Sequence, residues 1–158
     1  MIYYSMAKIL IASDTHGNKE QFKQLILENE FTHIIFCGDL LKDVEDIEHN
    51  NLIKVKGNWD EWFIDNKNKL EEVVEIEGVK FIVTHGHKYG VKSGLGGLIK
   101  RAEQENAKVV CYGHTHIKDV QTINGVLYIN PGAFSYFKGG KHTYVTIEIA
   151  DKKIIVNS

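Results

Sequence analysis

The chain has 158 residues and a formal net charge of -2 at pH 7, with 43% of its residues hydrophobic and 25% charged. These values are ordinary for a globular protein and exclude a largely disordered chain. We expect a single domain over residues 1–158, with residues 1–6 as a disordered or extended N-terminal segment.

The sequence also disfavours several functional classes. Its longest apolar runs are far shorter than the roughly 20 residues of a membrane-spanning helix, and its N-terminus lacks the pattern of a secretory signal. Arg101 is the only arginine, so dedicated nucleic-acid binding is not expected. Cys37 and Cys111 lie in apolar runs, which is typical of buried thiols in a reducing compartment. We expect a cytoplasmic protein without a membrane partner. The sequence does not decide whether the protein is a monomer or a homo-oligomer.

Short apolar runs alternate with polar turns in the first half of the chain. A strand over residues 8–13 leads into a helix that ends near residue 29. A second strand over 32–37 is followed by a polar stretch that we expect to be helical, and a third strand covers 52–56. Each of these strands ends in a polar turn.

Consecutive strands dominate the second half. We expect, in chain order, a hairpin over 73–83, a helix over 94–105, a strand over 108–112, a hairpin over 120–129 and two strands over 144–149 and 153–156. Asn124-Gly125 is a strong two-residue turn signal within the second hairpin. This order indicates an α/β protein in which helices flank a core of two sheets.

Side chains that can bind metal ions follow five of the predicted strands. The ends of neighbouring strands in layered α/β folds open onto a common edge, so we expect these side chains to lie close together. There are seven of them: Asp14 and His16, Asp39, Asn58, His85, and His114 with His116.

Four of the five fragments have a simpler structural explanation when each is taken alone, whereas His114-Thr115-His116 fits a metal site and a structural role equally well. Asp14 or Thr15 could cap the following helix, and Asp39 could also be a capping carboxylate. Asn58 after a glycine could be a turn residue, and His85 could be a buried, hydrogen-bonded histidine. The occurrence of five such fragments in order, all at strand ends, favours a metal site.

The chemistry of the seven side chains indicates which ions they would bind. Carboxylate oxygen, amide oxygen and imidazole nitrogen without thiolate suit manganese, iron, nickel or zinc, whereas calcium and magnesium prefer more oxygen ligands. We expect two divalent transition-metal ions, with Mn²⁺ favoured. Two divalent ions carry four positive charges, and the carboxylates of Asp14 and Asp39 would neutralise only two of them. The site would therefore stay net positive, which suits a phosphate ester.

Taken together, the strand-end motifs resemble the calcineurin-like metallophosphoesterases, in particular their small single-domain bacterial and archaeal phosphodiesterase branch. The resemblance runs from about Ala7 to Ile149 and implies a four-layer α/β/β/α sandwich with two mixed β-sheets. The motifs that carry it are Asp14-x-His16, Gly38-Asp39, Gly57-Asn58, His85 before Gly86-His87, and Gly113-His114-Thr115-His116.

The resemblance implies a function and a role for each residue. It implies a phosphoesterase, with diesters favoured, in which a metal-bridging hydroxide attacks a small-molecule phosphate ester. The implied catalytic residues are Asp39, Asn58, His85 and His114. In the implied ligand set, one ion takes Asp14, His16 and His116, the other takes Asn58, His85 and His114, and Asp39 bridges them.

Two positions depart from the family pattern. Many members have a histidine after the Gly-Asn pair that protonates the leaving group, and Trp59 stands there in this chain. Because general acid catalysis typically contributes 10² to 10⁴-fold, a leaving group that needs little protonation, such as an aryl oxide, would suffer least. The Asp-Arg-Gly of protein phosphatases is also missing after Asp39, which makes phosphoprotein substrates less expected.

Other candidates and functions stay open at this stage. His87 could orient a ligand, donate a proton or lie at the surface. The glycine-rich segment 90–97, with Lys92 and Ser93, could be a wall of the site or a flexible approach to the next helix. The aromatic residues Trp59, Trp62 and Phe63 could line the site or merely pack. Two alternative functions are a non-catalytic protein-interaction scaffold of the same fold and a nuclease acting on single strands.

Overall fold

The computed structural model describes residues 6–62, 67–135, 137–138 and 141–157. Phe63 and residues 1–5 of the expected N-terminal segment therefore lie outside the described part of the chain. The helices are α1 (Lys19–Leu27) and α2 (Gly96–Glu105). The strands are β1 (Met6–Ala12), β2 (His33–Phe36), β3 (Leu52–Lys54), β4 (Glu71–Ile76), β5 (Val79–Thr84), β6 (Val109–Cys111), β7 (Lys118–Ile123), β8 (Val126–Pro131), β9 (Phe137–Lys138), β10 (Lys141–His142), β11 (Val145–Ala150) and β12 (Lys153–Asn157).

Two five-stranded sheets form the centre of the fold. The first has the order β12-β11-β1-β2-β3 and the second the order β4-β5-β6-β8-β7, while β9 and β10 pair separately. In the first sheet β1, β2 and β3 are parallel and β11 is antiparallel to both of its neighbours. In the second sheet β5, β6 and β8 are parallel and the two outer strands are antiparallel. Both sheets are mixed, as the family resemblance implied.

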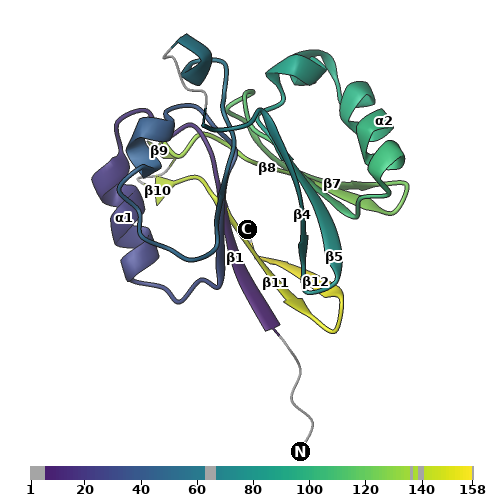
Figure 1. Cartoon of the computed structure of the whole chain (residues 1–158), viewed down its shortest axis with the longest axis horizontal. Coiled ribbons are helices and arrows are strands. Elements are labelled where there is room, and N and C mark those ends of the chain that lie inside the picture. Colours follow the sequence, from purple (N-terminus) through teal and green to yellow (C-terminus); the bar gives the residue numbers. More distant parts are fainter. Residues whose placement is uncertain (1–5, 63–66, 136, 139–140, 158) are drawn as a thin grey trace, which may run out of the picture.

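Three hydrophobic layers hold the sheets and helices together. Strand β1 shows how one strand serves two of them, because Ile9 and Ile11 face the core between the sheets while Leu10 and Ala12 face the core that contains Phe22 of α1. A third core packs α2, through Leu98 and other side chains, against the second sheet. Figure 1 shows α1 and α2 on opposite outer sides of the two sheets. The predicted α/β/β/α sandwich is confirmed.

Two local predictions need correction. The polar stretch after β2, which we expected to be helical, forms only a short 3-10 turn at Leu41–Val44. The reason is tertiary, because the N–H groups of Leu40 and Leu41 donate to the buried carboxylate of Asp60. The short hairpin of β9 and β10 was not predicted, since strands of two residues have no periodicity to detect.

Neither helix in the described part of the chain is long and apolar enough to cross a bilayer.

The carboxyl ends of the central strands meet at one edge of the sandwich. Within the first sheet, the N–H of Asp14 donates to the carbonyl of Gly38 at 2.9 Å, so the loops after β1 and β2 are joined. Within the second sheet, the N–H of Gly113 donates to the carbonyl of His85 at 3.0 Å. The two sheets are joined by the ring of His85, whose Nδ1 lies 2.8 Å from the carbonyl oxygen of Cys37. The predicted convergence of the strand ends is therefore present.

Candidate metal centre

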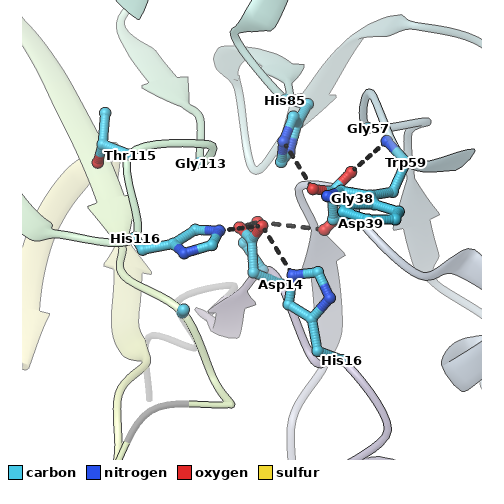
Figure 2. Close-up of polar contacts among 12 residues, drawn as sticks. Asp14, His16, Gly38, Asp39, Gly57, Trp59, His85, Gly113, Thr115 and His116 are labelled. Atoms are coloured by element: carbon cyan, nitrogen blue, oxygen red, sulfur yellow. Dashed lines mark hydrogen bonds and ion pairs between the residues drawn. The ribbon is translucent and has the colours of Figure 1, made fainter. Parts of the chain in front are cut away.

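Asp14 is the fully buried carboxylate at the base of the site. Its Oδ1 lies 3.0 Å from Nε2 of His116 and 3.6 Å from Nε2 of His16. Its Oδ2 accepts a 2.5 Å hydrogen bond from the hydroxyl of Ser13. Figure 2 shows the two imidazoles approaching Asp14 from different loops, one after β1 and the other after β6. Residues 102 positions apart in the chain thus meet on one carboxylate.

Asp39 lies between two groups of predicted ligands. On one side, its carboxylate belongs to a cluster with Asp14, His16 and His116, in which one possible ligand atom from each residue lies within 4.8 Å of the others. On the other side, its Oδ2 lies 3.4 Å from Nε2 of His85. A carboxylate in this position can contact two ions at once.

His85 and His114 form the second group with Asp39. The ring of His85 is fully buried, and its centroid lies 5.1 Å from that of His114. Since the carbonyl of Cys37 can only accept, Nδ1 of His85 carries a proton, and Nε2 is the ring nitrogen that faces the site.

Asn58 is held next to Asp39 by its chain neighbours. The N–H of Trp59 donates to Asp39 Oδ1 at 3.0 Å. A Cβ added to Gly57 would lie only 1.9 Å from the same oxygen, so the backbone approaches Asp39 too closely for any side chain at this position. Gly113 meets a similar limit, because its added Cβ would lie 2.3 Å from Ser13 Oγ. The glycines in these motifs are therefore required by close packing around the carboxylates.

Three predicted ligands offer a buried polar atom that no described residue satisfies. These atoms are Nε2 of His16, Oδ1 of Asn58 and Nε2 of His85. Buried polar atoms are almost always hydrogen-bonded, and each exception needs a cause. Divalent cations would supply the missing partner to two imidazole nitrogens and an amide oxygen, all of which are ordinary ligands of transition metals. The residues present therefore fit such ions.

The backbone at the site adopts an unusual conformation. Five of the seven predicted ligands have positive φ angles: 54° at Asp14, 39° at His16, 62° at Asp39, 72° at His114 and 64° at His116. Such angles are uncommon outside glycine and concentrate where a side chain must be aimed at a functional centre.

Electrostatics favours the metal-binding states of Asp14 and His114, whereas the neighbouring carboxylates raise the pKa of His16 and of His85. Burial opposes ionisation of Asp14, but the nearby imidazoles of His116 and His16 outweigh it and hold the pKa of this carboxyl well below its usual range. Burial, together with the charges of His85 and Lys92, lowers the pKa of His114 to about 4. At neutral pH Asp14 is therefore an anion and His114 a neutral ring with a free lone pair.

A comparison with protein families decides the affiliation. The model of the calcineurin-like phosphoesterase superfamily domain matches residues 7–152. The chain belongs to this superfamily. The family resemblance inferred from the strand-end motifs is therefore confirmed, and the match covers nearly the whole sequence.

Relatives within the superfamily include bacterial and archaeal proteins. The chain is 36% identical over 127 residues to the probable metallophosphoesterase YsnB of Bacillus subtilis, covering 79% of this chain and 73% of YsnB. It is 35% identical over 150 residues to a phosphodiesterase of Methanocaldococcus jannaschii, covering 79% of this chain and 82% of that protein. The crystal structure of a predicted phosphoesterase from Streptococcus pneumoniae superposes with a TM-score of 0.77 at 25% identity, covering 97% of this chain and 88% of the other.

Two carboxylates that support this superfamily site were missed by the sequence analysis. Asp60 is buried, and its Oδ2 accepts hydrogen bonds from the N–H groups of Asp39 at 3.0 Å and Gly57 at 2.8 Å. It therefore joins the loops after β2 and β3. Its place three residues after Gly57, where a side chain can accept from the start of its own turn, was the available signal.

Asp43 is the second supporting carboxylate. It accepts hydrogen bonds from the hydroxyl of Thr15 at 2.8 Å and from the N–H of Gly17 at 2.7 Å, and these two residues flank His16. The sequence offered no signal for this contact, because it joins residues 26 and 28 positions apart.

The simpler explanations of single fragments have mixed outcomes. Neither Asp14 nor Thr15 caps α1, because Asn18 is the N-cap residue and makes no side-chain cap hydrogen bond. Asp39 accepts from Trp59 and does not cap the 3-10 turn that follows it. His85 is buried and hydrogen-bonded, as the simpler explanation held, yet its Nε2 is left over for another partner.

The remaining candidates lie around the second group of ligands. The ring centroid of His87 lies 5.5 Å from that of His85 and 6.0 Å from that of His114. Nε2 of His87 lies 3.4 Å from Glu61 Oε2, so the ring faces the site and is not a free surface histidine. Lys92 is exposed, and its charge reaches His114.

Proposed function

We propose that the protein is a metal-dependent phosphodiesterase that hydrolyses a small-molecule phosphate ester with two divalent transition-metal ions, Mn²⁺ being favoured. The observation that carries this proposal is the set of buried, unsatisfied ligand atoms on His16, Asn58 and His85, grouped around two buried carboxylates. Contacts of His16 and His85 with the two carboxylates would still leave the buried amide oxygen of Asn58 without a partner.

The proposed ligand assignment follows the two groups of contacts. Asp14, His16 and His116 would hold one ion, and the short distances from Asp14 Oδ1 to both imidazoles support this. Asn58, His85 and His114 would hold the other, supported by the packing of the two histidine rings. Asp39 would contact both ions, because its carboxylate faces both groups.

When bound, two divalent ions would activate water as a nucleophile and stabilise charge on the phosphoryl group. The protein's own contribution is to hold the ligands in place. The buried carboxylates of Asp14 and Asp39 offset only part of the ionic charge, so the site attracts an anionic phosphate. Asp43 and Asp60 fix the loops that carry His16 and Asp39, which keeps these ligands aimed before any substrate arrives.

The preference for diesters is supported by the relative named a phosphodiesterase, and Trp59 bears on the leaving group. Trp59 stands where many relatives carry a protonating histidine, and an indole cannot supply a proton to a departing oxygen at neutral pH. A substrate whose leaving group departs as a stable anion would be hydrolysed best. We further propose one domain over residues 1–158 and a cytoplasmic location, which the two buried free thiols of Cys37 and Cys111 support.

The test is hydrolysis of bis(p-nitrophenyl) phosphate by the protein loaded with Mn²⁺, together with its metal content by elemental analysis. We expect two ions per chain and activity in the parent, and a loss of more than about 100-fold in kcat/KM in Asp39→Asn and His114→Ala. His33→Ala is the matched control, because His33 contacts Thr32 away from the site and its loss should change neither readout. Activity of the two site variants equal to that of the parent would disprove the proposal, and a parent without bound metal would favour the scaffold function.

A further inference from the structure

Trp59 presents a large apolar ring at the mouth of the candidate metal centre. The residue is 55% exposed, although burying a tryptophan ring is strongly favourable. Its ring centroid lies 6.5 Å from that of His16, and the two planes are nearly perpendicular at 85°. In Figure 2 Trp59 lies directly beside Asp39. The ring is therefore close to the proposed ligands but is not part of the core.

The backbone of Trp59 is fixed although its ring is exposed. Its N–H donates to Asp39 Oδ1 at 3.0 Å. The next residue, Asp60, is buried and accepts hydrogen bonds from backbone N–H groups on the loops after both β2 and β3. These contacts fix the backbone of Trp59 beside the carboxylate that faces both groups of proposed ligands. An exposed aromatic ring on a fixed backbone beside a polar site is suited to contact a ligand.

The chemistry of the same position limits which ligand this would be. Indole has no acidic proton to give to a leaving group, so a departing oxygen that is stable as an anion would suffer least. Aryl oxides meet this requirement, because the aromatic ring delocalises the negative charge. An aryl group is also the kind of group that an indole face or edge binds, at centroid distances of about 4.5–7 Å. The absence of a proton-donating histidine at position 59 and the presence of the Trp59 indole therefore favour the same class of leaving group.

We infer that Trp59 is a specificity-determining residue that packs against an aromatic leaving group, so that the preferred substrates are aryl phosphodiesters. This inference rests on the proposed function. In the reaction the bond between phosphorus and the aryl oxygen breaks, and the electron pair leaves with the aryl oxide. The oxygen of water forms the new bond to phosphorus, and the proton of water passes to the solvent.

Two phosphonates that differ only in their organic group test the inference by binding alone. Isothermal titration of the Mn²⁺-loaded protein with phenylphosphonate and methylphosphonate measures the contribution of the aromatic ring on a common anionic head. We expect the parent to bind phenylphosphonate about tenfold more tightly than methylphosphonate. Trp59→Ala should remove this preference and leave the affinity for methylphosphonate unchanged, whereas Trp59→Phe should retain most of the preference.

The matched control is Trp62→Ala, because Trp62 is 82% exposed on the following turn and should leave the ratio of the two affinities as in the parent. Retention of the full phenyl preference in Trp59→Ala would overturn the inference. So would equal binding of the two phosphonates by the parent, a result that leaves the proposed metal and phosphate site standing. Failure of both phosphonates to bind the metal-loaded parent would overturn the proposed function as well.

Discussion

At the scale of single residues, Asp39 and Asp60 have different roles: Asp39 is a proposed metal ligand, and Asp60 holds the loops around it. Asp39 turns one oxygen toward the N–H of Trp59 and the other toward His85, so its carboxylate is oriented before any ion arrives. Asp60 touches no proposed ligand atom and instead accepts from the backbone N–H of Asp39 and three other N–H groups. A buried carboxylate with four donors is a strong local constraint, because each donor would otherwise be left without a partner.

We predict that Asp60→Asn lowers the free energy of unfolding of the metal-free protein by about 2 kcal/mol, since an amide offers one acceptor oxygen and turns its NH₂ group toward backbone donors. Urea unfolding followed by circular dichroism measures this. Asp46→Asn is the control, because Asp46 is exposed and pairs only with lysine side chains, and its removal should change stability by less than about 0.5 kcal/mol. Equal stability of the two variants would show that Asp60 does not hold the loops.

At the scale of secondary-structure elements, the site depends on how closely the loops after the strands approach one another. The loop after β6 comes so near to the loop after β1 that Gly113 has no room for a side chain. Gly96, at the start of α2, has open space around its Cα and no positive φ angle. The two glycines therefore make a matched pair for the same substitution.

We predict opposite outcomes for the two glycine-to-alanine variants. Gly113→Ala should lower both the melting temperature and the affinity for Mn²⁺, because its Cβ would force Ser13 away from Asp14. Gly96→Ala should raise stability by about 0.5–1 kcal/mol and leave Mn²⁺ binding unchanged, since alanine favours the helix. Thermal unfolding and metal titration measure both effects. A tolerated Gly113→Ala would contradict the close approach of the two loops.

The same elements explain how much could be predicted from the sequence. The turn at Asn124-Gly125 was predictable because both residues adopt the positive φ angles, 52° and 78°, that this dipeptide favours. The seven ligand candidates were predictable because each follows a strand whose end could be located. The 3-10 turn at Leu41–Val44 and the support by Asp43 and Asp60 were not predictable, because they arise from contacts between loops distant in sequence.

At the scale of the whole molecule, the sandwich brings the two groups of proposed ligands to one edge. The first sheet supplies Asp14 and His16 after β1 and Asp39 after β2, and the second sheet supplies His85 after β5. The ring of His85 crosses between the sheets to the carbonyl of Cys37, so packing of the two sheets and assembly of the site are coupled. The fold and the proposed dimetal centre therefore form together.

Anomalous X-ray diffraction at the manganese edge, from crystals grown with Mn²⁺, tests this account most directly. We predict two anomalous peaks on either side of Asp39, one in contact with Asp14, His16 and His116 and the other with Asn58, His85 and His114. The absence of any peak at these residues, or a single peak that does not touch Asp39, would contradict the proposed dimetal centre.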